Sequence, residues 1–384
     1  MECSFANLQV MKKTFTPLIF IYTMLVGLIS CSSSHVGILS KKTAREKYQQ
    51  RIEKLLPQQS DAWKYAGEFA LQHPLAIPVP YAETGFISGD KADATAFYFS
   101  VKAGQKVNVY FNKTNPALTS YTELWQVKEN NERILLASAD TLLNTIQYSS
   151  LYPGNFMVRL QPQLGARGSY TLSILINPIL GFPIIATANS SIGSYWGDAR
   201  DDGARKHEGI DIFAKKGTAI VAVADGIIDY VEENDLGGKV ISLIPFNQNY
   251  SVYYAHLDNQ LVQDGQRVKK GDIIGTVGNT GNAKFTQAHL HFGIYNKANQ
   301  AIDPLYFVQK INAPIIYDAT HLNEWYFTSG KAKLYPSPAR QNAYTITDVK
   351  IKTESYCNNF YRVQLENGSK AFVAANDLTN KMKL

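Results

Sequence analysis

The sequence predicts a mostly β, multidomain protein. Its 384 residues exceed the usual size of one domain, which suggests two or three domains. Between about Val79 and Ile176, apolar and polar residues alternate in runs such as "AFYFSV" and "KVNVYF", and such alternation is typical of half-buried strands. Glycine and β-branched residues are frequent from residue 185 to about 310, and short alternating runs return after Trp325. Only short helices are expected, near the N-terminus.

The first residues have the pattern of a secretory signal. Two lysines precede an apolar run from Phe15 to Ile29, which is short for a membrane span. The run ends in "LISC", which resembles a bacterial lipobox whose cysteine is lipidated. We therefore expect residues 1–31 to be a signal peptide with a lipobox. A lipid on Cys31 would hold the chain at a membrane of the cell envelope, on the periplasmic side or in the outer membrane if the source is Gram-negative. An uncleaved signal anchor is the alternative.

Composition restricts the remaining possibilities. The formal net charge of +6 is too small to indicate a nucleic-acid partner, although it would not hinder work beside an anionic polymer. Of three cysteines, Cys3 lies before the signal and Cys31 would carry lipid, so the mature chain cannot form an internal disulfide. The third, Cys357, is expected to be a structural residue.

Residues 32–75 are interpreted as a tether followed by short helices. Ala44, Tyr48, Ile52 and Leu55 recur at helical spacing until Pro57 interrupts, and a second helix is expected from about Asp61 to Leu71. Residues 76–180 predict a β-sandwich, because alternating runs are separated by turn residues. The order of these runs resembles the pre-peptidase domains of secreted bacterial proteases. This region holds no set of residues that suggests catalysis.

Residues 181–312 and 313–384 predict two further β units. In the first, runs such as "GTAIVAVADGIIDYV" and "VKKGDIIGTVGNTG" predict a twisted antiparallel sheet with tight turns and no long amphipathic helix. In the second, "FYRVQLENGSKAFVAANDL" resembles a bacterial SH3-like domain, a small barrel. Such domains often bind cell-wall peptides, but the fold alone does not establish that function.

The stretch "QAHLHFGI" contains the first candidate functional residues. Its alternation predicts a strand with Leu290, Phe292 and Ile294 in the core and His289 and His291 side by side on the other face. Two imidazoles so close repel each other when both are protonated, so a metal or a shared water is a natural reason to pair them. A polar sheet edge is the alternative.

Three more candidates lie in "RKHEGIDIF" and "YYAHLD". Gly209 and the β-branched residues that follow it disfavour a helical H-E-x-x-H-type motif, so Glu208 is not placed as a general base. We instead expect a strand with Asp211 pointing away from its two flanking isoleucines and His207 arriving from a preceding loop. His256 would share a face with Val252 and Tyr254 if that segment is extended.

Together these segments resemble LytM/lysostaphin-type zinc endopeptidases, which cut peptide cross-links of bacterial peptidoglycan. The resemblance is carried by "HEGIDI", "YAHL", "GQRVKKGDIIGTVGNTG" and "HLHFGI", in that order and spacing. It implies one Zn²⁺ per chain, bound by His207, Asp211 and His291. His256 and His289 would stay off the metal as the catalytic acid and base while a metal-activated water attacks the scissile carbonyl.

The expected function is therefore a zinc metalloendopeptidase acting on peptidoglycan peptide stems. A non-catalytic wall-binding regulator, or an activator of another wall hydrolase, is the alternative, and a protein regulator of the enzyme itself is possible. The oxyanion-stabilising residue stays open among Tyr195, Arg200 and Arg205, because Tyr195 lies rather far upstream of His207. The bond that is cut, the histidine that acts as base, autoinhibition and oligomeric state also stay open.

Overall fold

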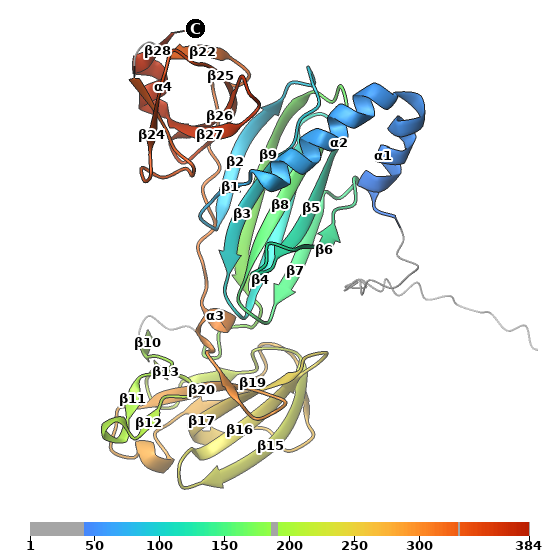
Figure 1. The fold of residues 1–384 in the computed structure, drawn as a ribbon. Coiled ribbons are helices and arrows are strands. Elements are labelled where there is room, and N and C mark those ends of the chain that lie inside the picture. Colours follow the sequence, from blue (N-terminus) through green and yellow to red (C-terminus); the bar gives the residue numbers. More distant parts are fainter. Residues whose placement is uncertain (1–41, 186–190, 329–330, 384) are drawn as a thin grey trace, which may run out of the picture. The chain divides into compact units, whose positions relative to one another are not determined.

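The computed structural model describes residues 42–185, 191–328 and 331–383, and within them it is a mostly β protein (Figure 1). The expected signal peptide, the lipidated Cys31 and the start of the tether lie outside the described residues. Every helix in the described ranges is too short or too polar to span a bilayer.

Two helices precede the first sheet. Helix α1 (Ala44–Leu55) starts at a capping box, in which the Thr43 side chain accepts from the Glu46 backbone N–H and the Glu46 carboxylate accepts from that of Thr43. Helix α2 (Pro57–Gln72) begins at Pro57, so the expected start near Asp61 is wrong. Proline is favoured in the first turn of a helix, where its missing N–H costs no hydrogen bond. The Trp63 side chain is fully buried and donates from Nε1 to the Pro162 carbonyl at 2.8 Å.

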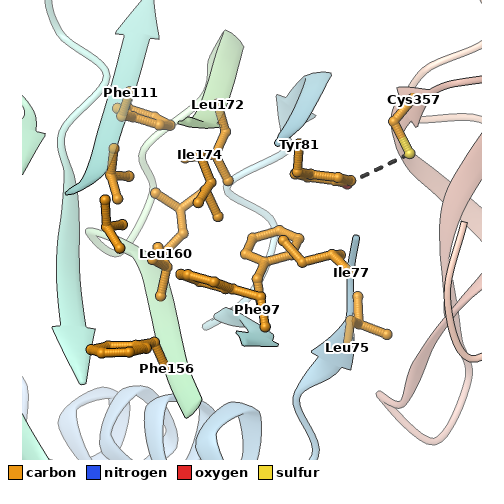
Figure 2. Packing of buried hydrophobic residues seen from close by; sticks show 14 of the residues in the cluster. Leu75, Ile77, Tyr81, Phe97, Phe111, Phe156, Leu160, Leu172, Ile174 and Cys357 are labelled. Carbon is orange, nitrogen blue, oxygen red and sulfur yellow. Dashed lines mark hydrogen bonds between the residues drawn. The ribbon is translucent and has the colours of Figure 1, made fainter. Parts of the chain in front are cut away.

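The region after α2 is built from two facing sheets. One sheet has the order β1 (Leu75–Ala76), β3 (Thr95–Val101), β8 (Gly154–Pro162), β5 (Ser120–Val127) and β6 (Arg133–Ser138). The other contains β2 (Tyr81–Ile87), β9 (Gly168–Pro178), β4 (Gln105–Lys113) and β7 (Thr145–Ser150). Figure 2 shows side chains of both sheets meeting in one core, among them Phe97 from β3 and Leu172 from β9.

The C-terminal strands extend the second of these sheets. They are β22 (Trp325–Thr328), β25 (Lys350–Cys357), β26 (Phe360–Leu365), β27 (Lys370–Ala374) and β28 (Met382–Lys383), with β23 (Lys331–Leu334), β24 (Tyr344–Thr347) and helix α4 (Ala375–Lys381) beside them. Strand β25 pairs with β2, with Thr84 opposite Tyr356 and Gly85 opposite Ser355. These strands also enclose a core of their own around Ile351 and Val363. A separate SH3-like domain from residue 313 stays a prediction.

Cys357 lies at the junction between β25 and β2. Cys357 is 2% exposed, and its Sγ lies 3.6 Å from the Tyr81 hydroxyl oxygen (Figure 2). Burial raises the pKa of the Cys357 thiol to about 12, with the nearby Glu83 carboxylate adding to the rise. A thiol that resists ionisation is a poor nucleophile, which supports the structural role expected for this residue.

The candidate functional residues lie on a separate antiparallel sheet. Its order is β10 (Ser191–Ser194), β13 (Ile210–Phe213), β20 (His289–Asn296), β17 (Tyr250–Gln260), β16 (Gly238–Pro245), β15 (Gly226–Asn234) and β18 (Arg267–Val268). Beside it lie β14 (Ala219–Val221), β19 (Ile273–Val277), β21 (Ala301–Ile302), the hairpin β11 (Ala199–Arg200) and β12 (Arg205–Lys206), helix α3 (Leu305–Val308) and the 3-10 turns η1 (Asp201–Gly203) and η2 (Gly281–Ala283).

Candidate metal centre

Strands β13 and β20 bring an aspartate and a histidine face to face. In their antiparallel register Asp211 lies opposite His291. The flanking residues point to the other side of the sheet, where Ile212 and Phe292 have no exposed surface. Because side chains alternate between the faces of a strand, burying these apolar neighbours turns Asp211 and His291 toward the opposite face. The expected orientations of both residues are confirmed.

His207 reaches the same face from the loop after β12. Its backbone N–H donates to the Asp198 carbonyl at 2.8 Å, and its ring is 4% exposed. Ring atom Nδ1 lies 2.9 Å from the Tyr195 carbonyl oxygen, which can only accept, so Nδ1 carries the proton. Atom Nε2 therefore presents its lone pair to Asp211, whose Oδ1 is 3.0 Å away. This backbone hydrogen bond orients the ring as partners of metal-binding histidines commonly do.

Three donor atoms form a nearly equilateral triangle at this point. His207 Nε2 lies 3.0 Å from Asp211 Oδ1 and 3.0 Å from His291 Nδ1, and His291 Nδ1 lies 3.1 Å from Asp211 Oδ1. Zinc bonds of about 2.0–2.1 Å in tetrahedral arrangement require donors separated by about 3.3 Å. The spacing therefore fits zinc, and the chemistry of two imidazoles and one carboxylate fits it as well.

Gly209 makes room for this arrangement. A Cβ at residue 209 would lie 2.7 Å from His291 Cε1 and 2.7 Å from the carbonyl oxygen of Phe292. Both distances are shorter than any ordinary contact, and the second neighbour is backbone that cannot move aside. The glycine in "HEGID" is thus required by the close approach of His291. The sequence alone did not indicate this requirement.

His256 reaches the site through a bulge in β17. Tyr254 lies opposite Ile241 of β16, whereas Leu257 lies opposite Lys239, so β17 contains one extra residue between these pairs. Tyr254 and Leu257 are both fully buried, which places the extra residue on the other side of the strand. His256 has φ of +63°, a left-handed conformation that is uncommon for a residue with a side chain.

The expectation that His256 shares a face with Val252 and Tyr254 is therefore wrong. Those two side chains belong to the buried core, while the His256 ring lies 5.0 Å from the ring of His289 and 5.9 Å from that of His291, measured between centroids. The bulge breaks the period of two that the prediction assumed.

His256 and His289 are held by carbonyl groups in the same way. His256 Nδ1 lies 2.9 Å from the Thr280 carbonyl oxygen, and His289 Nδ1 lies 2.7 Å from that of Gln287. A carbonyl only accepts, so each Nδ1 donates and each Nε2 keeps its lone pair. His289 Nε2 is 4.0 Å from Asp211 Oδ1, so it lies beside the donor triangle without belonging to it.

The pKa values agree with this arrangement. Burial raises the pKa of Asp211, but the neighbouring His207 and His291 rings more than offset this effect and hold the pKa well below its usual range. Burial lowers the pKa of His291, partly offset by Asp211. Burial, with further lowering from His289 and His291, brings the pKa of His256 to about 4. His256 is thus a neutral imidazole at pH 7, able to accept a proton.

A cleft of about 750 Å³ opens over these side chains. Its lining includes all five predicted site residues and several residues that the sequence did not single out: Ser194, Leu236, Tyr253, Asn282 and Tyr295. Tyr253 could not have been found from alternation, which places it on the face opposite His256 in "SVYYAHL"; the bulge brings both to the cleft. The Tyr253 ring lies edge-on to the His291 ring at 6.2 Å.

Of the three candidates for oxyanion stabilisation, two line the cleft and one does not. Tyr195 is 47% exposed and is not among the residues lining the cleft. Arg205 lines the cleft, and so does Arg200, whose Nη2 donates to Asp211 Oδ2 at 2.6 Å.

Residues 205–304 match the model of Peptidase family M23. Over 122 residues the chain is 37% identical to an L-Ala–D-Glu endopeptidase of Bacillus subtilis, covering 30% of this chain and 37% of that protein. Over 102 residues it is 39% identical to a protein of Salmonella dublin named murein hydrolase activator NlpD, covering 27% of this chain and 26% of that one. The chain thus spans less than two fifths of the length of these relatives.

A solved structure with a similar region is the catalytic domain of lysostaphin from Staphylococcus simulans. It is 32% identical, the match covers 31% of this chain and 92% of that domain, and the TM-score is 0.29.

Proposed function

We propose, from the match of residues 205–304 to the model of Peptidase family M23, that the chain is a zinc-dependent endopeptidase that hydrolyses peptide cross-links of bacterial peptidoglycan. His207 Nε2, Asp211 Oδ1 and His291 Nδ1 would hold one zinc ion per chain. One observation carries the proposal. Three donors with zinc spacing share a cleft with two further histidines whose Nε2 atoms are not taken up by hydrogen bonds to the backbone.

In this proposal one set of residues binds the metal and another set transfers protons. Zinc, when bound, lowers the pKa of water to about 7 and polarises a peptide carbonyl. Two histidines and one carboxylate leave a fourth position open, as catalytic rather than structural sites require. His256 or His289 would take a proton from water at Nε2. The amine that leaves would receive that same proton, either from the same ring or through the other histidine, whose Nε2 also starts without a proton. Such proton transfer contributes about 10²–10⁴-fold to rate.

The test uses purified protein lacking residues 1–31 and isolated bacterial sacculi. We expect new amino termini to appear, and a chelator to stop their release. His256→Ala should keep zinc yet lose turnover, whereas His207→Ala should lose both. Undiminished turnover in His256→Ala would contradict its proposed role.

The name of the Salmonella relative favours a second candidate function, activation of another murein hydrolase. Such an activator would release no amino termini alone, but it would increase the activity of an added wall hydrolase, and the His256→Ala variant would do so equally well. The complete set of five site residues in one cleft supports the enzyme over this alternative.

The location follows from the same proposal. A lipid on Cys31 would hold the chain in the envelope within reach of peptidoglycan, and the strands on either side of the peptidase domain would position it. A D-alanyl to diamino-acid cross-link is the proposed bond for a Gram-negative source, and a glycine bridge is the alternative. Mass spectrometry of digested wall fragments distinguishes the two.

A further inference from the structure

The hairpin of β11 and β12 delivers two side chains to the metal centre. Arg200 and Arg205 are opposite each other in its register, and His207 follows β12 directly. His207 supplies a donor atom to the triangle, as described above. Arg200 contacts Oδ2 of Asp211 whereas His291 contacts Oδ1, so the two oxygens of the aspartate meet different partners.

The guanidinium of Arg200 is held by two hydrogen-bond acceptors. Its Nη2 donates to Asp211 Oδ2 at 2.6 Å and to Ser194 Oγ at 2.7 Å. Ser194 lies opposite Asp211 in the pairing of β10 with β13, and its hydroxyl donates to Asp198 Oδ2 at 3.0 Å. The side chain of Arg200 is 33% exposed but that of Asp211 is only 9% exposed, so the contact is partly shielded from water.

We propose that Arg200 is a positioning residue that makes Asp211 a one-oxygen metal ligand. The proposal rests on the zinc site proposed above. A carboxylate can bind a metal through one oxygen or through both. With Oδ2 held by Arg200, only Oδ1 faces His207 Nε2 and His291 Nδ1. Binding through both oxygens would occupy a position that a catalytic site must keep open.

Charge and positioning predict opposite effects when Arg200 is replaced. If Arg200 acted only through its positive charge, its loss would remove repulsion and strengthen binding of a cation. If it orients Asp211, its loss should weaken binding about 10- to 100-fold, as for other partners that orient metal ligands. A role limited to the oxyanion would lower turnover and leave metal binding unchanged.

The experiment compares Arg200→Met and Arg200→Lys with the wild-type protein lacking residues 1–31. Lys297→Met is the matched control, because it removes one positive charge from an exposed turn after β20. Zinc affinity is measured by competition with a chromogenic chelator, and the visible spectrum of the Co²⁺-loaded protein reports coordination number. Arg200→Gln, which keeps an amide donor, replaces Arg200→Met if circular dichroism shows that Arg200→Met is unfolded.

We expect Arg200→Met to bind zinc about 10- to 100-fold more weakly, with weaker Co²⁺ bands as coordination rises above four. Arg200→Lys should recover only part of the affinity, and Lys297→Met should match wild type. Unchanged or tighter binding in Arg200→Met with an unchanged spectrum would overturn the positioning role. If wild type and His207→Ala bind zinc equally poorly, the zinc site itself is contradicted, whatever Arg200 does.

Discussion

At the scale of single residues, backbone conformation decides which side chains reach the site. His256 enters the cleft because its left-handed φ and the bulge around it reverse the alternation of β17. Residues in such conformations persist only where surrounding contacts hold them, and they gather at functional sites. Here the contacts are a hydrogen bond from the His256 N–H to the Gly237 carbonyl and one from its ring to Thr280.

Gly209→Ala should weaken zinc binding. The added methyl would press on the His291 ring and on the Phe292 carbonyl, so His291 must leave the donor triangle. We expect a loss of at least about 10-fold in zinc affinity, comparable to disturbing a ligand's support. Isothermal titration with zinc measures the effect.

Gly217→Ala is the control for that substitution. Gly217 has φ of +85° but nothing within 4 Å of an added Cβ. The Gly217→Ala substitution should lower the free energy of unfolding by about 1 kcal/mol through backbone strain and leave zinc affinity unchanged. Equal zinc affinity in Gly209→Ala and wild type would contradict the account of the close approach.

The sequence allowed part of this site to be predicted. Asp211, His289 and His291 follow from strand alternation, because the apolar residues beside them leave one possible orientation. The orientation of His256 could not be predicted, since a bulge has no period and φ is not visible in residue spacing. The contact of Arg200 with Asp211 also depends on the path of a short hairpin that turn residues alone do not specify.

At the scale of elements, two loops hold the base candidate in place. The turn between β15 and β16 contributes the Gly237 carbonyl, which accepts from the His256 N–H, and Gly238 follows it as the first residue of β16. The segment before η2 contributes Thr280, whose carbonyl accepts from the His256 ring. The Thr280 hydroxyl is itself fixed, since it accepts from the Lys239 N–H at 3.0 Å and donates to the Leu257 carbonyl at 2.9 Å. Neither loop contributes a proposed zinc ligand.

Gly238→Ala should therefore reduce turnover while zinc binding persists. Its Cβ would lie 2.2 Å from Thr280 Oγ1 and 2.4 Å from the Gly281 nitrogen, and its φ is +64°. Displacing Thr280 misplaces His256, so we expect kcat to fall by about 10²-fold, the lower end of what proton transfer contributes. Gly165→Ala, with φ of +73° and open space, controls for backbone strain. Full turnover with zinc bound in Gly238→Ala would contradict this role of the loops.

At the scale of the whole molecule, a buried ion pair joins β2 to β26. Arg362 donates from Nη2 to Glu83 Oε1 at 3.0 Å and from Nε to Oε2 at 3.1 Å. Tyr81, Tyr170 and Ser355 donate to the same carboxylate. Burial raises the pKa of Glu83, but Arg362, Ser355 and Tyr170 together lower it below its ordinary value.

Glu83→Gln should destabilise the protein by about 3–5 kcal/mol, because it leaves Arg362 buried without its counter-charge. Folding lowers the pKa of Glu83, so the ionised carboxylate contributes its full stabilisation at pH values above the unfolded pKa of about 4.3. This contribution to the free energy of unfolding is lost as the pH falls from there through the lower pKa of the folded state. The melting temperature of wild type should thus fall toward that of Glu83→Gln on acidification. Glu129→Gln, at an exposed position, is the control. A constant difference between pH 7 and pH 3 would contradict this role of Glu83.

The architecture was predictable where periodicity is strong. The mostly β class, the early helices and the antiparallel sheet that carries the site follow from period-two and helical patterns. The pairing of β25 with β2 could not be predicted, because it joins strands about 270 residues apart through backbone hydrogen bonds that residue type does not encode.

Zinc content of the purified wild-type chain, measured by mass spectrometry of the metal after exposure to excess zinc and dialysis, decides whether the donor triangle holds a metal. We expect one zinc per chain in wild type and in His256→Ala, and none retained in His207→Ala. A wild-type chain that retains no zinc, or a His207→Ala variant that retains as much as wild type, would contradict the proposed zinc site.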